Sequence, residues 1–456
     1  MFTLKDILAS TKGRSVSKGM PPSFSGISTD SRKIRRGELF IPIKGDNFDG
    51  HKFIGSALKK GAAAALTSKR SNAAGSALIR VKDTLSAFHD IALSHRKKFL
   101  PAGRHGKLSV TGITGSSGKT TTKDMLASIL SLAGCTLKTE ENYNNEIGVP
   151  QTLLKLVKKH KFAVIEMAMQ GLGEIKELAR ISLPNIAIIT NIGSAHMEHL
   201  GSMQNIARAK SEILAFQGKN DIAILPADDE YFGYLRKRSR GKVLSYGSNI
   251  DADVRATNIM FSGDSSIFTI ETPGVSVAIN LPLPGRHNVH DALAAAAAAF
   301  TLGIKPQLIK KGLETFRLSG KRTSIIRTKH FRVIDDTYNA NPDSMAASLE
   351  MLENYDSRRI AVLGDMLELG SISKKSHRII GSLAANLEID ALITVGRSAK
   401  DIALSAKEHG LAAVRHVLTN RQAVKLLNKM LRINDTVLIK GSRGMHMEEI
   451  VKGLMK

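Results

Sequence analysis

Short apolar runs alternate with helical patterns through the middle of the chain. The strand-like runs cover residues 108–113, 162–167, 186–192 and 222–225, and helical segments lie between several of them. Such an alternation is typical of a mainly parallel β-sheet that carries helices on both of its faces. The pattern predicts a central α/β domain over residues 83–318.

The same alternation returns in the last third of the chain. Here the strand-like runs cover residues 331–334, 360–363, 391–395 and 436–439, and helical segments fill the gaps. This predicts a smaller, doubly wound, Rossmann-like domain over residues 319–456. The pattern G-x-G-x-x-G does not follow its first strand, so we predict no dinucleotide cofactor.

The beginning of the chain, residues 1–82, has a looser pattern. Its apolar runs, 39–43, 62–66 and 77–81, are short and are separated by turns that contain Gly and Asp. This indicates a small α/β module. The predicted fold class is therefore α/β with three domains, namely this N-terminal module, the central parallel-sheet domain and the C-terminal Rossmann-like domain.

The charge of the chain is strongly positive. It has 66 Lys and Arg against 41 Asp and Glu, a formal net charge of +25. Such an excess favours anionic partners, among them nucleic acid, anionic lipid and phosphorylated small molecules. The basic residues are spread along the chain, however, and no module interleaves them with aromatic side chains as single-strand binders do. We therefore predict no nucleic-acid partner.

The cysteine content and the lengths of the apolar runs indicate the cellular compartment of the protein. Cys135 is the only cysteine, so no intrachain disulfide can form, which fits a reducing environment. The N-terminus lacks a positive leader followed by a long apolar core. No apolar run approaches the roughly 18 residues that span a bilayer, and the run 292–300 predicts a buried helix instead. We expect a cytoplasmic monomer without a membrane span.

A Gly/Ser loop follows the apolar run 108–113. Behind it, Met125 with Ile129 and Leu126 with Leu130 have helical spacing. Glycines let backbone N–H groups close around phosphate oxygens, a lysine adds charge at the β- and γ-phosphates, and a threonine hydroxyl binds Mg²⁺. The predicted phosphate-binding loop consists of Thr114, Gly115, Ser116, Ser117, Gly118, Lys119, Thr120 and Thr121.

This loop departs from the pattern G-x-x-x-x-G-K-[ST], because Ile113 stands where the first Gly is expected. Gly-Lys-Thr alone also fits a plain strand-to-helix turn. The strand, the Gly-rich loop, Gly-Lys-Thr and the amphipathic helix nevertheless come in the order that phosphate binding requires. We therefore predict a P-loop ATPase-like central domain that binds ATP.

Segments spread over nearly the whole chain carry a resemblance to a known family. Together with the loop they are residues 28–32, 142–150, 164–167, 190–196, 209–212, 285–288, 319–322, 335–342, 364–370 and 440–443. In this order they resemble the Mur ligase family. Its members are ATP-dependent ligases that form amide bonds and build the peptide stem of bacterial peptidoglycan precursors.

Within the family, the chain is most similar to members that add D-alanyl-D-alanine to a UDP-N-acetylmuramoyl tripeptide. The similarity lies in Ser116-Ser117, in the stretch Tyr338-Asn339-Ala340-Asn341 and in residues 364–370. Members that add the third stem residue usually carry an Asp-Asn-Pro-Arg-like segment, where this chain has Val395-Gly396-Arg397-Ser398. The resemblance implies an acyl-phosphate intermediate, with the tripeptide and the dipeptide as substrates.

Three other functions stay open. One is a sibling ligase that adds a single amino acid, and another is a folylpolyglutamate-type ligase; the N-terminal module and the segments of the third domain argue against both. The alternative from another class is an RNA-binding protein or a regulatory nucleotide switch. It would bind RNA with a steep salt dependence and would form no amide.

The resemblance also assigns residues of the ATP site. It implies that Asn288 contacts the adenine, that Arg322 reaches the phosphates when the third domain closes, and that Asp336 accepts hydrogen bonds from the ribose, with Asn339 and Asn341 nearby. Asn341 also stands before Pro342, which is typical of a helix start. Both roles of Asn341 can hold together.

Two magnesium ions are implied, and both would lie near the loop. Thr120 and Glu166, which ends an apolar run, would hold the first ion; spacing alone leaves Glu166 open between this role and a surface carboxylate. His196 and Lys210 are assigned to the second only by the resemblance, in which the lysine is often carbamylated by CO₂. By composition alone, Lys210 is an ordinary helix-surface lysine. The implied catalytic residues are Lys119, Lys210, His196 and Arg322.

Two further groups of polar residues belong to the substrates in the resemblance. The UDP-linked substrate is assigned to Ser28, Asp30, Ser31, Arg32, Gly45, Asp49, Gly50, His51, Asn142, Asn144 and Asn145. The alternative for the N-terminal members is a turn-rich loop, since Ser, Asp and Gly favour turns. Residues that follow strands of the third domain are expected to contact the dipeptide or to stabilise domain closure, namely Asp365, Glu368, Lys440, Ser442 and Arg443.

Overall fold

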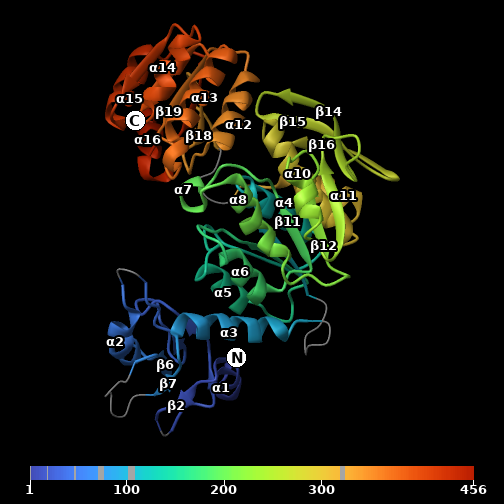
Figure 1. The fold of residues 1–456 in the computed structure, drawn as a ribbon, viewed down its shortest axis with the longest axis vertical. Coiled ribbons are helices and arrows are strands. Elements are labelled where there is room, and N and C mark those ends of the chain that lie inside the picture. Colours follow the sequence, from blue (N-terminus) through green and yellow to red (C-terminus); the bar gives the residue numbers. More distant parts are fainter. Residues whose placement is uncertain are drawn as a thin grey trace. The chain divides into compact units, whose positions relative to one another are not determined.

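The computed structural model describes residues 2–17, 19–45, 48–69, 77–100, 108–318 and 324–455. The chain forms two compact units (Figure 1). The first contains Met1–Leu108, Tyr143–Lys161 and Arg180–Leu183, and the second contains Ser109–Asn142, Phe162–Ala179 and Pro184–Lys456. The domain boundaries expected at residues 82 and 318 stay predictions.

The first unit is a small α/β structure. Its five-stranded sheet has the order β2-β7-β6-β5-β4, in which only β2 is antiparallel to its neighbour, and β1 pairs with β3 apart from it. The elements are β1 (Phe2–Thr3), α1 (Leu4–Thr11), β2 (Arg14–Ser15), β3 (Ser23–Phe24), β4 (Ile27–Ser28), β5 (Leu39–Phe40), η1 (Gly50–Phe53), α2 (Ile54–Lys59), β6 (Ala64–Thr67), β7 (Leu78–Arg80), α3 (Thr84–Lys97) and α5 (Gly148–Leu154). Phe24, Leu39 and Phe88 lie in its buried core.

A nine-stranded sheet forms the centre of the second unit, in the order β16-β15-β14-β13-β12-β11-β8-β10-β9. The strands from β9 to β14 pair in parallel, and β15 and β16 continue the sheet as antiparallel strands. The strands are β8 (Ser109–Thr114), β9 (Thr136–Lys138), β10 (Phe162–Glu166), β11 (Ile186–Ile189), β12 (Ile222–Pro226), β13 (Lys242–Gly247), β14 (Val254–Ser262), β15 (Ser265–Thr272) and β16 (Val275–Leu281).

The helices of this part are α4 (Lys119–Ser131), α7 (Met197–Leu200), α8 (Met203–Ser211), η2 (Glu212–Leu214), α9 (Phe232–Arg236), α10 (Arg286–Thr301) and α11 (Pro306–Thr315), while α6 (Glu174–Ser182) begins in the second unit and ends in the first. Helix α10 buries every alanine from 292 to 299 against the core that α4 also enters. The buried helix predicted at 292–300 is therefore present.

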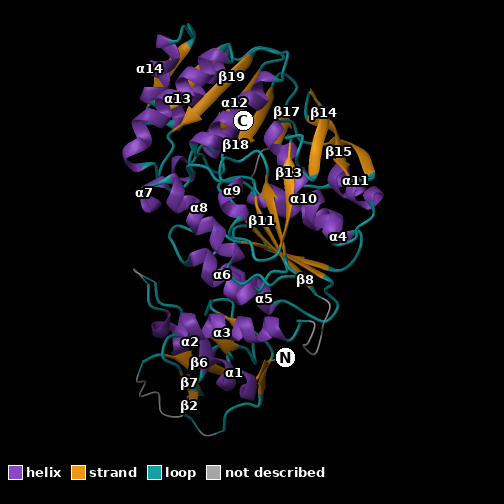
Figure 2. Cartoon of the chain, turned by 45° about the vertical axis from the view of Figure 1, so that its right-hand side comes forward, coloured by secondary structure: helices purple, strands orange, loops and turns teal. Residues whose placement is uncertain are grey.

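The last part of the second unit is a six-stranded sheet with the order β17-β18-β22-β19-β20-β21 (Figure 2). Only the edge strand β17 is antiparallel. The elements are β17 (Ser324–Arg327), β18 (Arg332–Asp336), α12 (Pro342–Glu353), β19 (Arg359–Gly364), η3 (Gly370–Ile372), α13 (Ser373–Asn386), β20 (Ala391–Val395), α14 (Lys400–Glu408), β21 (Val414–Val417), α15 (Asn420–Met430), β22 (Thr436–Lys440), η4 (Arg443–Met445) and α16 (Glu448–Leu454).

Alternate residues of these strands point to opposite faces, as the pleat of a strand requires. Ile334 and Ala361 join a core with α12, α13 and α14, whereas Val333 and Ile360 join a second core with α15 and α16. Helices therefore cover both faces, and the α/β prediction with parallel-sheet domains is confirmed. Among the described residues, no helix has the length and apolar character that crossing a membrane demands.

Candidate functional site

The predicted phosphate loop connects the end of β8 to the first turn of α4. Gly115 has φ of +154° and Gly118 has φ of +76°, values that side-chain-bearing residues rarely adopt. A Cβ atom at Gly115 would overlap the Thr190 hydroxyl, and one at Gly118 would overlap the Asp291 carboxylate. Glycine is therefore required at both positions by backbone conformation and by space.

The segment that follows β11 holds this loop in shape. Asn191 Oδ1 accepts hydrogen bonds from the backbone N–H of Ser116 at 3.0 Å and of Ser117 at 2.9 Å. Ser116 Oγ donates to the Gly193 carbonyl at 2.9 Å, and Thr190 Oγ1 donates to the Ser117 carbonyl at 2.5 Å. The sequence did not single out Asn191 or Thr190 as site residues, although both lie in the segment 190–196 that carries part of the resemblance.

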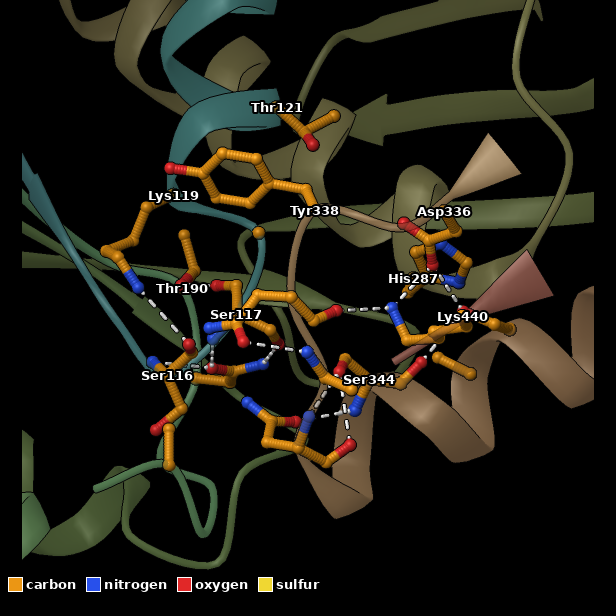
Figure 3. A pocket seen from close by; sticks show the side chains of 18 of the residues that line it. Ser116, Ser117, Lys119, Thr121, Thr190, His287, Asp336, Tyr338, Ser344 and Lys440 are labelled. Atoms are coloured by element: carbon orange, nitrogen blue, oxygen red, sulfur yellow. Dashed lines mark hydrogen bonds and ion pairs between the residues drawn. The ribbon is translucent and has the colours of Figure 1, made fainter. Parts of the chain in front are cut away.

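The side chain of Lys119 folds back over the loop. Its Nζ donates to the carbonyls of Gly115 at 2.7 Å and Ser116 at 3.2 Å. Figure 3 shows Ser116 and Lys119 on one side of a cavity and Asp336 and Lys440 on the other. The ammonium group thus lies against the carbonyls of the loop and at the edge of the cavity.

Thr120 and Glu166 form the part of the site that suits a divalent cation. Thr120 Oγ1 donates to Glu166 Oε2 at 2.8 Å, and both residues are buried. Hydroxyl and carboxylate oxygens are ligands that Mg²⁺ prefers, usually alongside substrate phosphates rather than in an all-protein cage. Within the described residues no group of three or more His, Cys, Asp or Glu forms such a cage. The pair fits a cation that is shared with a nucleotide.

His196 stands at the N-terminal end of α7 in a left-handed conformation, with φ of +62°. Its Nδ1 lies 3.0 Å from Glu368 Oε2. Burial, followed by the charges of Lys119 and Lys210, lowers the pKa of His196 from 6.5 to about 4, against the opposing effect of Glu368. The ring is therefore neutral near pH 7, and because the carboxylate accepts at Nδ1, the lone pair is left on Nε2.

Lys210 lies near the end of α8 and is almost completely buried. Burial, and then the positive charge of Lys119, lowers the pKa of Lys210 well below 10.5. The helix-surface role that composition favoured is therefore wrong. A buried amine with a lowered pKa is a better nucleophile than an ordinary surface lysine, because more of it is unprotonated.

A cavity of about 570 Å³ in the second unit is lined by the loop residues Ser116 to Lys119 and by His196, whereas Thr120, Glu166 and Lys210 do not line it. Its size is typical of small-molecule sites. Ser194 donates to Asp343 Oδ2 through its N–H at 2.8 Å and its Oγ at 3.0 Å, which joins the segment after β11 to the first turn of α12. Lining residues from the two sheets and their loops include Ser116, Lys119, Thr190, His196, Asp229, Asn288, Asp291, Asp336, Asn339, Asn341, Glu368, Lys440, Ser442 and Arg443.

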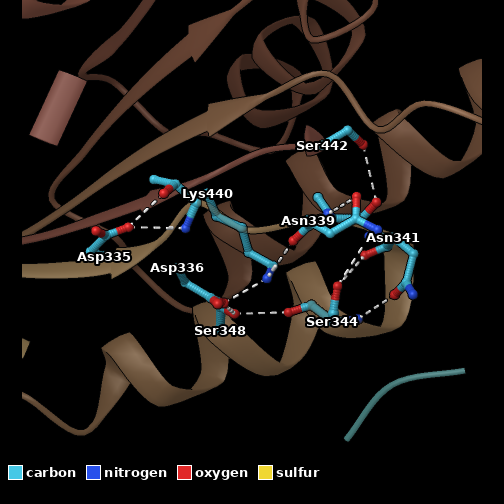
Figure 4. Close-up of polar contacts among 10 residues, drawn as sticks. Asp335, Asp336, Asn339, Asn341, Ser344, Ser348, Lys440 and Ser442 are labelled. Atoms are coloured by element: carbon cyan, nitrogen blue, oxygen red, sulfur yellow. Dashed lines mark hydrogen bonds and ion pairs between the residues drawn. The ribbon is translucent and has the colours of Figure 1, made fainter. Parts of the chain in front are cut away.

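Polar contacts orient the side chains on the C-terminal side of this cavity (Figure 4). Asp336 ends β18, and its Oδ2 accepts from Lys440 Nζ at 2.5 Å and from Ser348 Oγ at 2.7 Å. Asn341 caps α12 by accepting from the Ser344 N–H at 2.8 Å. The helix start predicted at Asn341-Pro342 is therefore confirmed, and its side chain still lines the cavity.

Three further residues predicted to bind ATP are Asn339, Asn288 and Arg322. Asn339 lines the cavity, and its Oδ1 accepts from the N–H of Ala340 at 2.9 Å and of Arg443 at 3.3 Å. Asn288 is buried at the start of α10, where its amide donates to the Pro284 carbonyl at 2.6 Å. Arg322 lies outside the described residues, so its predicted role stays untested.

In the first unit, several residues predicted to bind UDP contact each other. Asp49 accepts from His51 N–H at 3.0 Å, lies 2.8 Å from His51 Nδ1 and pairs with Lys69. The Lys69 contact, more than that of His51, holds the pKa of Asp49 well below 3.8. Asp30 likewise has a lowered pKa because it pairs with Arg32, whose NH2 lies 2.9 Å away.

The other residues of this predicted set make turn contacts. Ser28 Oγ donates to the Asp30 carbonyl at 3.2 Å, and Gly45 N–H donates to the Phe48 carbonyl at 2.8 Å. Asn145 Oδ1 accepts from the Gly148 N–H at 2.9 Å. Their assignment to a UDP substrate stays a prediction, as it does for Ser31, Gly50, Asn142 and Asn144.

His287, which lines the cavity, gives the protein an acid-sensitive stability. Burial lowers the pKa of His287 from 6.5 to about 4; Asp336 opposes this shift, and Lys440 and His290 add to it. The unfolded chain takes up this proton as the pH falls below 6.5, whereas the folded protein does so only near pH 4. The stability that neutral His287 contributes is therefore present above pH 6.5 and is lost as the pH falls toward 4.

We expect denaturant unfolding to reveal this loss when measured at about pH 7 and about pH 5. His287→Gln should narrow the difference in unfolding free energy between the two conditions. His446→Gln, at an exposed histidine, serves as the matched control and should keep the parent difference. An undiminished difference in His287→Gln would contradict the assignment.

Known families match most of the chain. The Mur ligase family, catalytic domain, matches residues 23–98; the Mur ligase middle domain matches residues 113–299; and the Mur ligase, glutamate ligase domain, matches residues 321–443. These matches include the phosphate loop and the cavity side chains contributed by the C-terminal sheet.

Similar proteins cover the chain from end to end. The UDP-N-acetylmuramoyl-tripeptide–D-alanyl-D-alanine ligase of Bacillus subtilis (strain 168) is 35% identical over 461 residues, which cover 100% of this chain and 98% of the relative. A crystal structure of MurF from Acinetobacter baumannii has a TM-score of 0.93 and 35% identity, covering 100% and 98% of the two chains. A MurF ligase from Thermotoga maritima in complex with ADP has a TM-score of 0.83 and 27% identity, covering 94% and 96%.

Proposed function

Because the chain belongs to the Mur ligase family, we infer that it is an ATP-dependent ligase that adds D-alanyl-D-alanine to a UDP-N-acetylmuramoyl tripeptide in peptidoglycan precursor synthesis. The observation that carries this inference is the end-to-end similarity to a ligase of that specificity. The cavity supports it, because residues Ser116 to Lys119 of the predicted phosphate loop line it. A sibling that adds a single amino acid is the weaker candidate.

The reaction has two steps that balance in atoms and charge. An oxygen of the tripeptide carboxylate attacks the γ-phosphorus of ATP, which forms an acyl phosphate and releases ADP. The amine of D-alanyl-D-alanine then attacks the acyl carbon, phosphate leaves, and the amine loses a proton. Since two anions must approach each other in the first step, the protein's task is positioning and electrostatic stabilisation.

The cavity residues suit this task. Lys119 offers a cation to the transferred phosphoryl group, and Asp336, held by Lys440 and Ser348, is oriented to accept from ribose hydroxyls. We assign Asn288 to the adenine, and Asn339 and Asn341 to the nucleotide edge of the cavity. Arg322 is assigned to the phosphates from its place in the family pattern alone.

Mg²⁺ is the metal that these oxygen donors fit. Thr120 and Glu166 would hold one ion, and neutral His196 with a modified Lys210 would hold a second. Such ions neutralise the charge that develops on the phosphoryl oxygens. In the protein itself, Glu166 is already turned toward Thr120, so little reorganisation of the first pair is needed.

The modification assigned to Lys210 is carbamylation. The neutral amine adds to the carbon of CO₂ and releases a proton, which converts a buried cation into an anion with two oxygen donors. The lowered pKa of Lys210 favours this step, and a carbamate would relieve its repulsion by Lys119. Solution NMR with isotope-labelled bicarbonate should show one carbamate signal that Lys210→Met removes. A spectrum without this signal would leave Lys210 unmodified.

The first unit is proposed to bind the UDP moiety. Asp30, Asp49 and His51 are polar groups whose orientation is fixed by neighbouring side chains or backbone. In Asp49→Asn, KM for the UDP-linked substrate should rise while KM for ATP stays at the parent value; equal changes in both would argue against this role.

Since ATP and UDP-linked precursors are cytoplasmic metabolites, we assign the protein to the cytoplasm, and we retain the expectation of a monomer.

Product formation with single omissions tests the function. The protein is incubated with Mg-ATP, UDP-N-acetylmuramoyl tripeptide and D-alanyl-D-alanine, and phosphate release and product mass are followed while each substrate is left out in turn. We expect product only when all three are present. Productive replacement of the dipeptide by a free amino acid would favour the sibling activity, and RNA binding without any amide product would favour a nucleotide switch.

A further inference from the structure

A second lysine of α4, Lys123, lies behind the phosphate loop and has no part in the chemistry described so far. Its side chain has no exposed surface, and among the described residues its Nζ makes no hydrogen bond. The ammonium lies 3.7 Å from Glu166 Oε2 and 3.5 Å from Asp124 Oδ1. Burial of an ammonium group is costly unless opposite charges compensate it. The two carboxylates therefore compensate the buried charge of Lys123.

One of the two carboxylates, that of Asp124, also pairs with Lys138. Asp124 Oδ1 lies 2.7 Å from Nζ of Lys138, a lysine whose side chain is 36% exposed. The ion pair of Lys138 with Asp124 is therefore much closer than that of Lys123. Glu166 forms an ion pair with Lys123, whose Nζ lies 3.7 Å from Oε2. The cluster of Lys123, Asp124, Lys138 and Glu166 balances two positive against two negative charges.

The position of Lys123 on α4 directs its ammonium group toward the carboxylate that Thr120 also contacts. Thr120 and Lys123 are three positions apart, so they lie on the same face of α4. Both address the same oxygen of Glu166, Thr120 Oγ1 at 2.8 Å and Lys123 Nζ at 3.7 Å. On the other side, the Glu166 N–H donates to Thr139 Oγ1 at 3.0 Å, which fixes the backbone at the end of β10. The carboxylate is thereby drawn toward the first turn of α4.

From this arrangement we propose that Lys123 is a positioning residue for the metal carboxylate: it holds Glu166 against Thr120 in the geometry that receives Mg²⁺. It touches neither nucleotide nor substrate and acts through Glu166. This inference rests on the proposed role of Glu166 in metal binding. Its test uses metal-free stability and nucleotide binding, which fail or succeed independently of which substrates are ligated.

The experiment is a double-mutant cycle with Lys123→Met, Glu166→Gln and both changes together. In the metal-free protein, Lys123→Met should lower the unfolding midpoint, because the buried Glu166 carboxylate loses the charge of Lys123, and the double variant should recover much of that loss since both charges are gone. Equal losses from Lys123→Met in the parent and in the Glu166→Gln background would overturn the proposal.

The second readout is the Mg²⁺ concentration at which ADP binding, measured by calorimetry, is half-maximal. Lys123→Met should raise it about tenfold, as removal of a group that orients a metal ligand typically does, and should add nothing in the Glu166→Gln background. Lys138→Met is the matched control, because it removes a similar side chain from the same cluster and leaves the Lys123–Glu166 pair in place; it should change the value less than twofold. An unchanged or lowered value in Lys123→Met would overturn the proposal, as would an equal rise in Lys138→Met.

Discussion

Replacement of Lys119 by alanine is expected to abolish ligation, with kcat/KM falling by about 10²–10³-fold or more. The loop offers one ammonium group at its mouth, where it now contacts the Gly115 and Ser116 carbonyls. Without it, the loop has no positive side chain to offset the repulsion between the attacking carboxylate and the γ-phosphate. Steady-state rates of phosphate release with all three substrates measure the effect.

The control is Lys237→Ala, which removes an exposed lysine that does not line the cavity. It should keep the parent rate, and both variants should keep the parent unfolding midpoint because Lys119 is partly exposed. Substantial activity in Lys119→Ala would mean that the loop is not the phosphate site.

Substitution of Gly115 by alanine should damage the loop itself. The added Cβ would overlap the Thr190 hydroxyl, and φ of +154° is unfavourable for alanine. Because Thr190 is in turn bonded to the Ser117 carbonyl, the clash cannot be relieved without loss of a loop contact. We expect the free energy of unfolding to fall by about 2–4 kcal/mol, and ADP binding to be lost.

Gly233→Ala is the matched control for this change. Gly233 is exposed within α9, has no neighbour within 4 Å of an added Cβ, and does not have a positive φ. Alanine there should be neutral or stabilise the protein by roughly 0.5–1 kcal/mol. Denaturant unfolding and calorimetric ADP titration compare the two variants, and a Gly115→Ala protein with parent stability and affinity would contradict the described loop conformation.

Local patterns in the sequence predicted much of the fold. Buried parallel strands form continuous apolar runs, so β8, β10 and β20 lie where the hydrophobic pattern indicated. The loop was predicted although Ile113 breaks the usual motif, because the order of strand, Gly-rich loop and helix is itself a physical requirement for phosphate binding. The family resemblance, drawn from motifs along the whole chain, is confirmed by the family matches.

Other features depend on contacts between distant segments and could not be predicted. The hairpin strands β14 and β15 were missed for a different reason, because their exposed and buried residues alternate and so form none of the continuous apolar runs that marked the parallel strands. Asn191 reaches the loop across 75 positions of sequence, and Lys123 is a lysine that no local pattern marks as buried. The burial of Lys210, which explains its lowered pKa, is likewise a property of tertiary packing.

We infer that the protein activates a substrate carboxylate by transferring phosphate to it from ATP. The most direct measurement uses UDP-N-acetylmuramoyl tripeptide whose terminal carboxylate carries heavy oxygen, with Mg-ATP and D-alanyl-D-alanine, and mass analysis of the released phosphate. We expect one heavy oxygen in phosphate for each amide formed, and Lys119→Ala should release labelled phosphate at a rate lower by about 10²–10³-fold or more. Amide formation with unlabelled phosphate would contradict this mechanism, because the carboxylate oxygen would then not have attacked phosphorus.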